Sequence, residues 1–197
     1  MKPVIKSGVV ISAICAAWLI ALWRAQIHDA QQGRLNAALF RAVDTDDFNA
    51  ANAALQAGAS VDVRRRVHPP SPWEPIDHAL THLWRPTAKF DQGFTPLMIA
   101  SIHGDVPMAT LLLNHDAKTE YFNSYAGTDT PLELAVTCKH TEMVITLLKH
   151  GANPSGAADC YGPIYIAWLQ KDTAMTKLLA SYGARPLPAS ITHNQQN

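Results

Sequence analysis

The sequence predicts an all-α protein in which copies of a helix pair stack side by side, preceded by one N-terminal transmembrane helix. Two observations lead to this fold class. The first is a long uncharged, apolar run close to the N-terminus. The second is a sequence block that recurs along the rest of the chain at spacings of 35 and then 32 residues. Periods of this length are typical of repeat proteins, whose units bury their apolar faces only against one another.

The apolar run extends from Gly8 to Trp23 and contains no charged residue. A membrane-spanning helix needs roughly 17–25 residues. The run can be extended back to Val4, because the side chain of Lys6 can reach outward to the lipid headgroups. A cleaved signal peptide needs small residues in an A-x-A-like site after the run, and neither candidate site there begins with a small residue. We therefore expect residues 8–23 to be an uncleaved transmembrane signal-anchor helix.

The basic residues around this run predict its orientation. Lys2, Lys6 and the amino terminus precede it, and Arg24 alone follows it directly. The positive-inside rule then places residues 1–7 in the cytoplasm and the repeats outside it, which in a bacterium means the periplasm. We expect residues 24–36 to be a linker between the membrane and the repeats.

The recurring block opens with threonine or glycine, then proline, and has an alanine at its sixth position. Its clearest copies are Thr95-Pro96-Leu97-Met98-Ile99-Ala100, Thr130-Pro131-Leu132-Glu133-Leu134-Ala135 and Gly162-Pro163-Ile164-Tyr165-Ile166-Ala167. Each copy is followed at a constant offset by a small pair, namely Asp116-Ala117, Gly151-Ala152 and Gly183-Ala184. A degenerate earlier copy begins at Ala37 and ends at Gly58-Ala59.

Elementary helix rules fit this block. Thr95 and Thr130 suit the N-cap position, and the prolines after them suit the first helical position. The recurring alanines allow neighbouring helices to approach closely. The second half of each block carries apolar residues at i and i+4, as in Met143 and Leu147, which predicts a second helix with one apolar stripe. The closing glycines, and Asp116 in their place, suit a left-handed residue that ends a helix.

These residues resemble the ankyrin repeat family. The T-P-L-x-x-A opening, the leucine-rich second helix and the closing G-A pair are its signature. The resemblance covers about residues 35–186 and implies an ankyrin-repeat solenoid at 37–186, with about four helix-turn-helix repeats joined by hairpin loops. Residues 64–90 depart from the pattern, and we interpret them as an inserted or truncated repeat. Residues 187–197 are expected to be a flexible tail.

The resemblance implies a function without catalysis. Ankyrin proteins typically bind a partner protein through the hairpin tips and the exposed ends of the first helices. Carried over by register, this surface holds Trp73, Asp91, Gln92, Phe94, Ile102, His103, Asp129, Tyr161, Leu169 and Gln170. The formal net charge of zero argues against a nucleic-acid partner. We expect no enzymatic activity, cofactor, metal or small-molecule substrate, and we interpret the chain as a membrane-anchored scaffold or inhibitor of another protein.

The alternative interpretation is a metal- or thiol-dependent enzyme. His78 and His82 have the i, i+4 spacing of two metal ligands on one helix face, but no acidic or cysteine partner lies at a motif-like distance. Cys138 and Cys160 are expected at opposite ends of a helix, too far apart for a disulfide. They are therefore candidate free thiols, and no nucleophile has a recognisable base partner.

Overall fold

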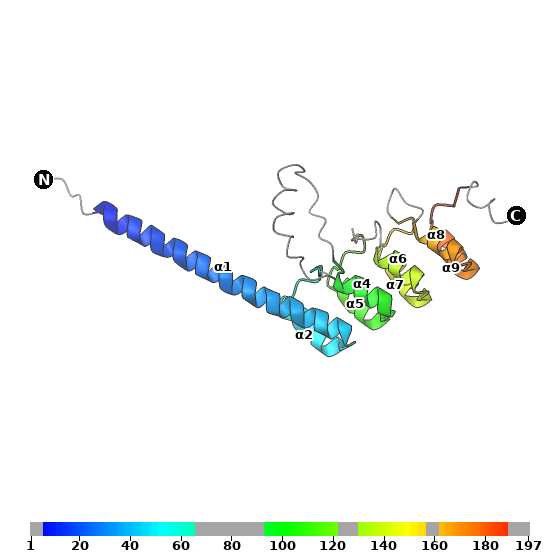
Figure 1. Ribbon diagram of the computed structural model, residues 1–197, viewed down its shortest axis with the longest axis horizontal. Coiled ribbons are helices and arrows are strands. Elements are labelled where there is room, and N and C mark those ends of the chain that lie inside the picture. The colour runs from blue at the N-terminus through cyan, green and yellow to red at the C-terminus, as the bar shows by residue number, and fades with distance from the viewer. Residues whose placement is uncertain (1–5, 66–92, 122–129, 157–161, 189–197) are drawn as a thin grey trace, which may run out of the picture.

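The computed structural model describes residues 6–65, 93–121, 130–156 and 162–188, which form helices and the loops between them (Figure 1). The helices come in pairs along the chain. They are α1 (Lys6–Asp44) with α2 (Phe48–Gln56), α4 (Pro96–His103) with α5 (Val106–Asn114), α6 (Pro131–Thr137) with α7 (Thr141–Lys149), and α8 (Gly162–Leu169) with α9 (Thr173–Ser181). The described ranges contain no β-strand, apart from a single antiparallel bridge between Arg65 and Phe94. The all-α prediction is confirmed for these residues.

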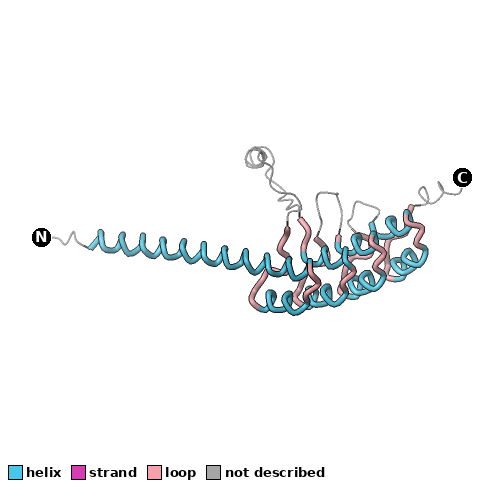
Figure 2. Tube along the Cα trace, turned by 60° about the horizontal axis from the view of Figure 1, so that its bottom comes forward, coloured by secondary structure: helices cyan, strands magenta, loops and turns pink. Residues whose placement is uncertain are grey.

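The pairs stack into two layers. The first helices α1, α4, α6 and α8 pack against one another in sequence order, and the second helices α2, α5 and α7 do the same. Figure 2 shows the layers as two rows of roughly parallel helices. The solenoid predicted from the repeating block is therefore what the chain forms.

Small side chains allow the first helices to pack closely. Ala42, Ala100, Ala135 and Ala167 occupy the same register in successive repeats, and each has at most 2% of its surface exposed. Between the layers, methionine and leucine pairs such as Met143 and Leu147 are fully buried. The predicted core is thus confirmed in both layers.

The helices begin at the expected caps. The Thr95 side chain accepts a hydrogen bond from the backbone N–H of Met98, at 3.2 Å. Thr130 and Glu133 form a reciprocal capping box, in which Glu133 Oε2 accepts from the Thr130 N–H at 2.8 Å. Satisfying these otherwise unpaired N–H groups stabilises the helix start. The left-handed conformation expected at the block ends is also present, with φ of 95° at Gly58 and 63° at Asp116.

Helix α1 is one continuous helix of 39 residues, and its N-terminal part projects beyond the stack (Figure 1). Residues 24–36, expected to be a linker, belong to this helix. The transmembrane helix expected at residues 8–23 is not shown: in the part of the chain that the structure describes, no helix is long and apolar enough to cross a membrane.

The loop that follows the first repeat forms hydrogen bonds with the start of the second repeat. Arg65 and Phe94 exchange two backbone hydrogen bonds, of 3.0 and 3.1 Å. Most of the segment expected as an inserted or truncated repeat, residues 64–90, lies between them, and residues 66–92 are outside the described residues.

Candidate protein-binding surface

The tight turns that join each first helix to its second helix form one row along the stack. We call this row the turn ridge, and it comprises residues 44–47, 102–105, 137–140 and 169–172. Every turn places one residue in the left-handed region at the same register, with φ of 52° at Asp46, 73° at Gly104, 61° at Lys139 and 57° at Lys171. Because the four turns share a backbone shape, equivalent side chains recur at intervals of one repeat.

An aspartate begins the second helix in most of these turns. Asp47, Asp105 and Asp172 each accept a hydrogen bond from the backbone N–H three residues on, at 2.9–3.0 Å. A carboxylate at this position also interacts favourably with the positive end of the helix dipole. These aspartates are therefore structural, although they lie on the candidate surface.

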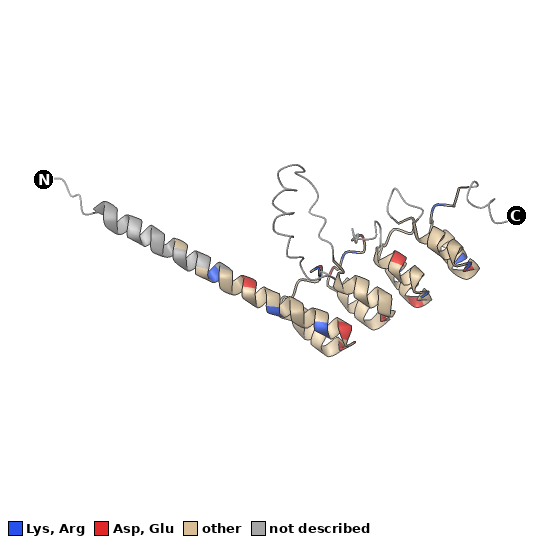
Figure 3. Ribbon diagram, viewed as in Figure 1, with Lys and Arg blue, Asp and Glu red and all other residues tan. Residues whose placement is uncertain are grey.

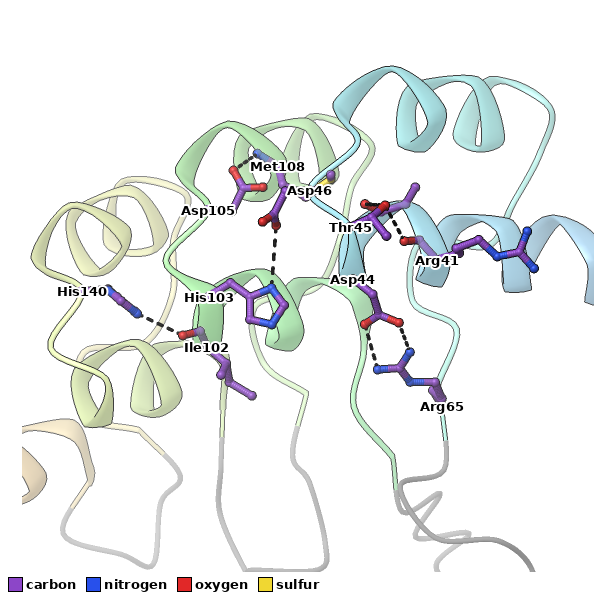
Figure 4. Close-up of polar contacts among 11 residues, drawn as sticks. Arg41, Asp44, Thr45, Asp46, Arg65, Ile102, His103, Asp105, Met108 and His140 are labelled. Carbon is purple, nitrogen blue, oxygen red and sulfur yellow. Dashed lines mark hydrogen bonds and ion pairs between the residues drawn. The ribbon is translucent and has the colours of Figure 1, made fainter.

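Side chains of the turn ridge tie each repeat to the one before it (Figure 4). His140 Nε2 lies 3.0 Å from the carbonyl oxygen of Ile102, which can only accept, so Nε2 carries the proton. Gln170 Nε2 donates in the same way to the carbonyl of Thr137, at 2.9 Å. These carbonyls lie in the last turn of a helix, where intrahelical partners are missing. The next repeat therefore supplies the bond that the helix end lacks.

Charged or titratable side chains make two contacts near the end of α1, one with the second repeat and one with the loop that follows the first repeat. His103 Nδ1 lies 3.7 Å from Asp46 Oδ1, with both side chains largely exposed. The two carboxylate oxygens of Asp44 accept hydrogen bonds from Nη1 and Nη2 of Arg65, the second at 3.0 Å (Figure 4). The same guanidinium lies over the ring of Phe40, 5.1 Å from its centroid. Exposed ion pairs of this kind add little stability. The Arg65–Asp44 pair holds the loop at Arg65 against the end of α1.

The structure divides the predicted contact residues between two ends of the first helices. Phe94 lies at the hairpin end, where it is half-buried, pairs with Arg65 and packs against the core. Ile102, His103, Leu169 and Gln170 lie on the turn ridge, at the other end of the first helices. Along its own helix, Ile102 is about 12 Å from Phe94 at 1.5 Å per residue. Leu169 is 53% exposed, and Gln170 is half-buried because it bonds to the preceding turn. Trp73, Asp91, Gln92, Asp129 and Tyr161 lie outside the described residues.

An aromatic pair next to the turn ridge was not predicted from the sequence. On α8 the rings of Tyr165 and Trp168 stack with centroids 5.8 Å apart, and both are partly exposed beside Leu169. Residues at i and i+3 share a helix face, so this spacing was the available signal. The last repeat therefore presents an apolar, aromatic surface at the end of its first helix.

The alternative interpretation, a metal- or thiol-dependent enzyme, depends on four residues, of which the structure describes one. His78, His82 and Cys160 lie outside the described residues, whereas Cys138 is an exposed free thiol on the turn ridge. Among the residues that the structure does describe, no three histidine, cysteine, aspartate or glutamate side chains come close enough to hold a metal ion.

A family model described as ankyrin repeats (3 copies) matches residues 76–158. Over these residues the chain is similar to the ankyrin repeat family, and the described pairs α1–α2 and α8–α9 continue the same arrangement on either side of them. No curated protein matches the sequence. Ankyrin repeats are typically protein-binding modules, and the similarity therefore suggests a module of this class.

Proposed function

We propose that the chain binds a partner protein through the turn ridge and acts as a scaffold or inhibitor of that partner, without catalysing a reaction. Exposed side chains at the ends of the first helices in successive repeats support this proposal. His103, Cys138 and Leu169 are all exposed at the ends of first helices, one from each of three consecutive repeats. Packed helices lie about 8–10 Å apart, so the ridge extends over a length that suits a protein partner better than a small molecule.

We expect the aromatic side chains beside the last turn of the ridge to contribute most of the free energy of binding to the partner protein. Leu169 lies beside the stacked rings of Tyr165 and Trp168, and binding energy at protein interfaces concentrates in a few aromatic or apolar anchors. An anchor there and polar contacts at His103 would let one partner bridge several repeats.

Site-specific photocrosslinking in the cells that make the protein tests this surface. A photoreactive amino acid placed at His103 or at Leu169 should give an adduct with the same protein. The matched controls are Lys149 and Lys177, which are exposed on the second helices α7 and α9. Adducts from the lysine positions alone would place the interface on the other layer and contradict the proposal.

We further propose that residues 8–23 anchor the protein in a membrane, with residues 1–7 in the cytoplasm and the repeats outside it. The uncharged run from Gly8 to Trp23 supports this proposal. Trp18 and Trp23 are also 67% and 64% exposed on the projecting part of α1, where water is an unfavourable environment for their indole rings.

Two measurements test the anchor. The mature protein should retain its N-terminus and resist extraction from membranes at alkaline pH, and a chain that begins near residues 25–31 would show cleavage instead. A reporter fused after Asn197 should be active outside the cytoplasm. Activity in the cytoplasm would reverse the orientation.

A further inference from the structure

Each first helix has two positions, three residues apart, that face the following repeat. In α1, α4 and α6 the side chains at these positions are at most 7% exposed. They are Phe40 and Val43 in α1, Met98 and Ser101 in α4, and Glu133 and Val136 in α6. Their counterparts in α8, the last first helix that the structure describes, are Tyr165 and Trp168, and both are partly exposed. The positions are thus buried wherever another repeat follows.

Contacts between the repeats explain this burial. First helices pack directly on one another, α4 on α6 and α6 on α8. The loop that leads to α8 also reaches α6, because a Cβ added at Gly156 would lie 2.6 Å from Oε1 of Glu133. Among the described residues α9 is the last helix, so Tyr165 and Trp168 mark the end of the first-helix layer. We call the surface formed by these two rings the end face.

The layer of second helices ends in a different way. Its inner helices hold apolar side chains, at most 9% exposed, at the two equivalent positions. These are Ala51 and Leu55 in α2, Ala109 and Leu113 in α5, and Val144 and Leu148 in α7. Helix α9 instead has Thr176 and Ala180, so an exposed alanine stands where the inner helices have a buried leucine. A terminal repeat requires an outer face that is compatible with water. At these positions α9 has such a face, whereas α8 keeps two aromatic rings.

The end face is apolar and uncharged. Its two rings stack with centroids 5.8 Å apart, and α8 has no charged residue from Gly162 to Leu169 (Figure 3). The first charged side chains beyond α8 are Lys171 and Asp172, in the turn at its end. Burying an unpaired charge is costly. We therefore expect uncharged, apolar side chains to cover the two rings.

A helix suits this surface better than an extended segment does. Buried backbone N–H and C=O groups must be paired, and the apolar rings offer them few partners. A helix pairs these groups internally. The equivalent surfaces of α1, α4 and α6 are each covered by the next first helix, at the 8–10 Å typical of packed helices. The end face thus continues an interface that the chain already uses three times.

We propose that the partner protein contributes one α-helix, with an uncharged apolar stripe, which packs along α8 on the end face and adds a helix to the first-helix layer. This inference rests on the proposed contact at the turn ridge and names the element that the partner brings to it. One helix is enough, because the α9 side of the last repeat has no large apolar side chain to cover at the equivalent positions.

The docked helix leaves the ridge itself accessible. Thr137 occupies in α6 the position that Leu169 occupies in α8, and Thr137 stays exposed although another repeat follows it. A helix on the end face should therefore leave Leu169 open to the rest of the partner. The same partner can then contact the ridge at Leu169 and at His103.

Photocrosslinking at the end of the stack tests which layer the partner covers. A photoreactive amino acid replaces Trp168 in α8, or Thr176 or Ala180 in α9, in the full chain in the cells that make it. Trp168 should give an adduct with the protein that is captured from Leu169, and the two α9 positions should give at least several-fold less of it. Mass spectrometry of the adduct should locate the crosslink in one segment of that protein, with apolar residues at i, i+3 and i+4 and no charge among them.

A substitution at the end face tests its contribution to binding. Trp168→Ser introduces the residue that α4 has at this position, Ser101, so the stack can accommodate it. Loss of a buried aromatic anchor should weaken binding about thirtyfold or more. About thirtyfold more protein should then be needed for the same yield of adduct from a photoreactive residue at His103. The matched control is Tyr182→Ser, which removes a ring that is 39% exposed at the end of α9 and should leave the yield unchanged. Circular dichroism checks that both variants are folded.

The outcomes distinguish this inference from the function on which it rests. Equal adducts from α8 and α9 would mean a two-layered occupant such as another repeat, and an adduct of the chain with itself would mean a second copy. Either result overturns the inference, as does a crosslinked segment without helical spacing or an unchanged yield for Trp168→Ser. If Trp168 gives no adduct but His103 and Leu169 do, the end face is not used and the turn ridge stands. If none of the three positions gives an adduct, the proposed function itself is wrong.

Discussion

Gly104 allows a direct test of how the turns hold neighbouring repeats together. Its φ is 73°, and a Cβ added there would lie 2.7 Å from Nδ1 of the His140 ring. Gly104→Ala therefore has two costs. A residue with a Cβ in the left-handed region costs roughly 1–2 kcal/mol. The His140 ring must also move, which breaks its 3.0 Å contact with the Ile102 carbonyl and costs about 1 kcal/mol.

The expected loss of unfolding free energy for Gly104→Ala is thus about 2–3 kcal/mol. Urea denaturation of the full chain in a mild detergent, followed by circular dichroism, measures it as a shift of the midpoint. With a dependence on urea of about 1–3 kcal/mol per M, the midpoint should fall by about 1 M or more.

A double-mutant cycle separates the two costs. In a His140→Ala background the ring is absent, so Gly104→Ala should cost only the backbone term of about 1–2 kcal/mol. The difference between the two backgrounds measures the coupling between Gly104 and His140. An equal cost in both backgrounds would show that the ring does not constrain this turn. An unchanged midpoint for Gly104→Ala would refute the left-handed turn itself.

The remaining predictions use the same denaturation assay. Ala135→Leu should lose about 1–3 kcal/mol, because Ala135 is fully buried where α6 packs against α4 and α8, and overpacking there strains the core; a wild-type midpoint would mean that the register is wrong. Glu133→Ala should lose about 0.5–2 kcal/mol with the capping box, whereas Glu133→Gln should lose less because its amide oxygen can still accept from Thr130; equal losses would contradict the cap. Lys139→Gly should stabilise the protein modestly, because it relieves a φ of 61° in a side-chain-bearing residue; a loss of stability would show that the lysine side chain contributes more than the backbone strain costs.

Local and periodic features of this fold were predictable from the sequence. The caps at Thr95 and Thr130, the buried alanines and the left-handed glycines each follow from a few neighbouring residues. These features recur at the same positions in each repeat, so a correct assignment of one repeat also predicts them in the others. Stacking was also predictable, since one helix pair cannot bury its own apolar stripe.

The contacts that join the repeats were not predictable in this way. His140 bonds to a carbonyl 38 residues earlier in the chain, and Gln170 bonds to one 33 residues earlier. Periodicity indicates which residues share a register, but not which of them donate hydrogen bonds to the unpaired carbonyl groups at helix ends. For the same reason Gln170, predicted as a contact residue, has a structural bond that only the packed repeats reveal.

Lys139 and Lys171 show a second limit. Lysine has no preference for the left-handed region, so nothing in the sequence around them indicates a positive φ. The packing of the two helices on either side determines each turn, and the lysine adopts the backbone shape that the turn requires. Tertiary structure here overrides local preference, and it does so at the two turns of the C-terminal repeats.

Helix α1 is continuous because no helix-breaking residue separates its projecting part from the first repeat. Residues 24–36 lie between an apolar run and a repeat, and such a position suggests a flexible linker. The segment contains no proline, and its alanine, glutamine, arginine and leucine residues favour helix. Gly33 is the one weak position; it costs about 1 kcal/mol relative to alanine, and helices on both sides offset that cost. Because no helix-breaking residue lies between them, the projecting segment and the first helix of the first repeat form one continuous, rigid helix. The direction in which the turn ridge faces is then a property of α1, and a single flexible insertion in residues 24–31 should change that direction without altering any contact within the repeats.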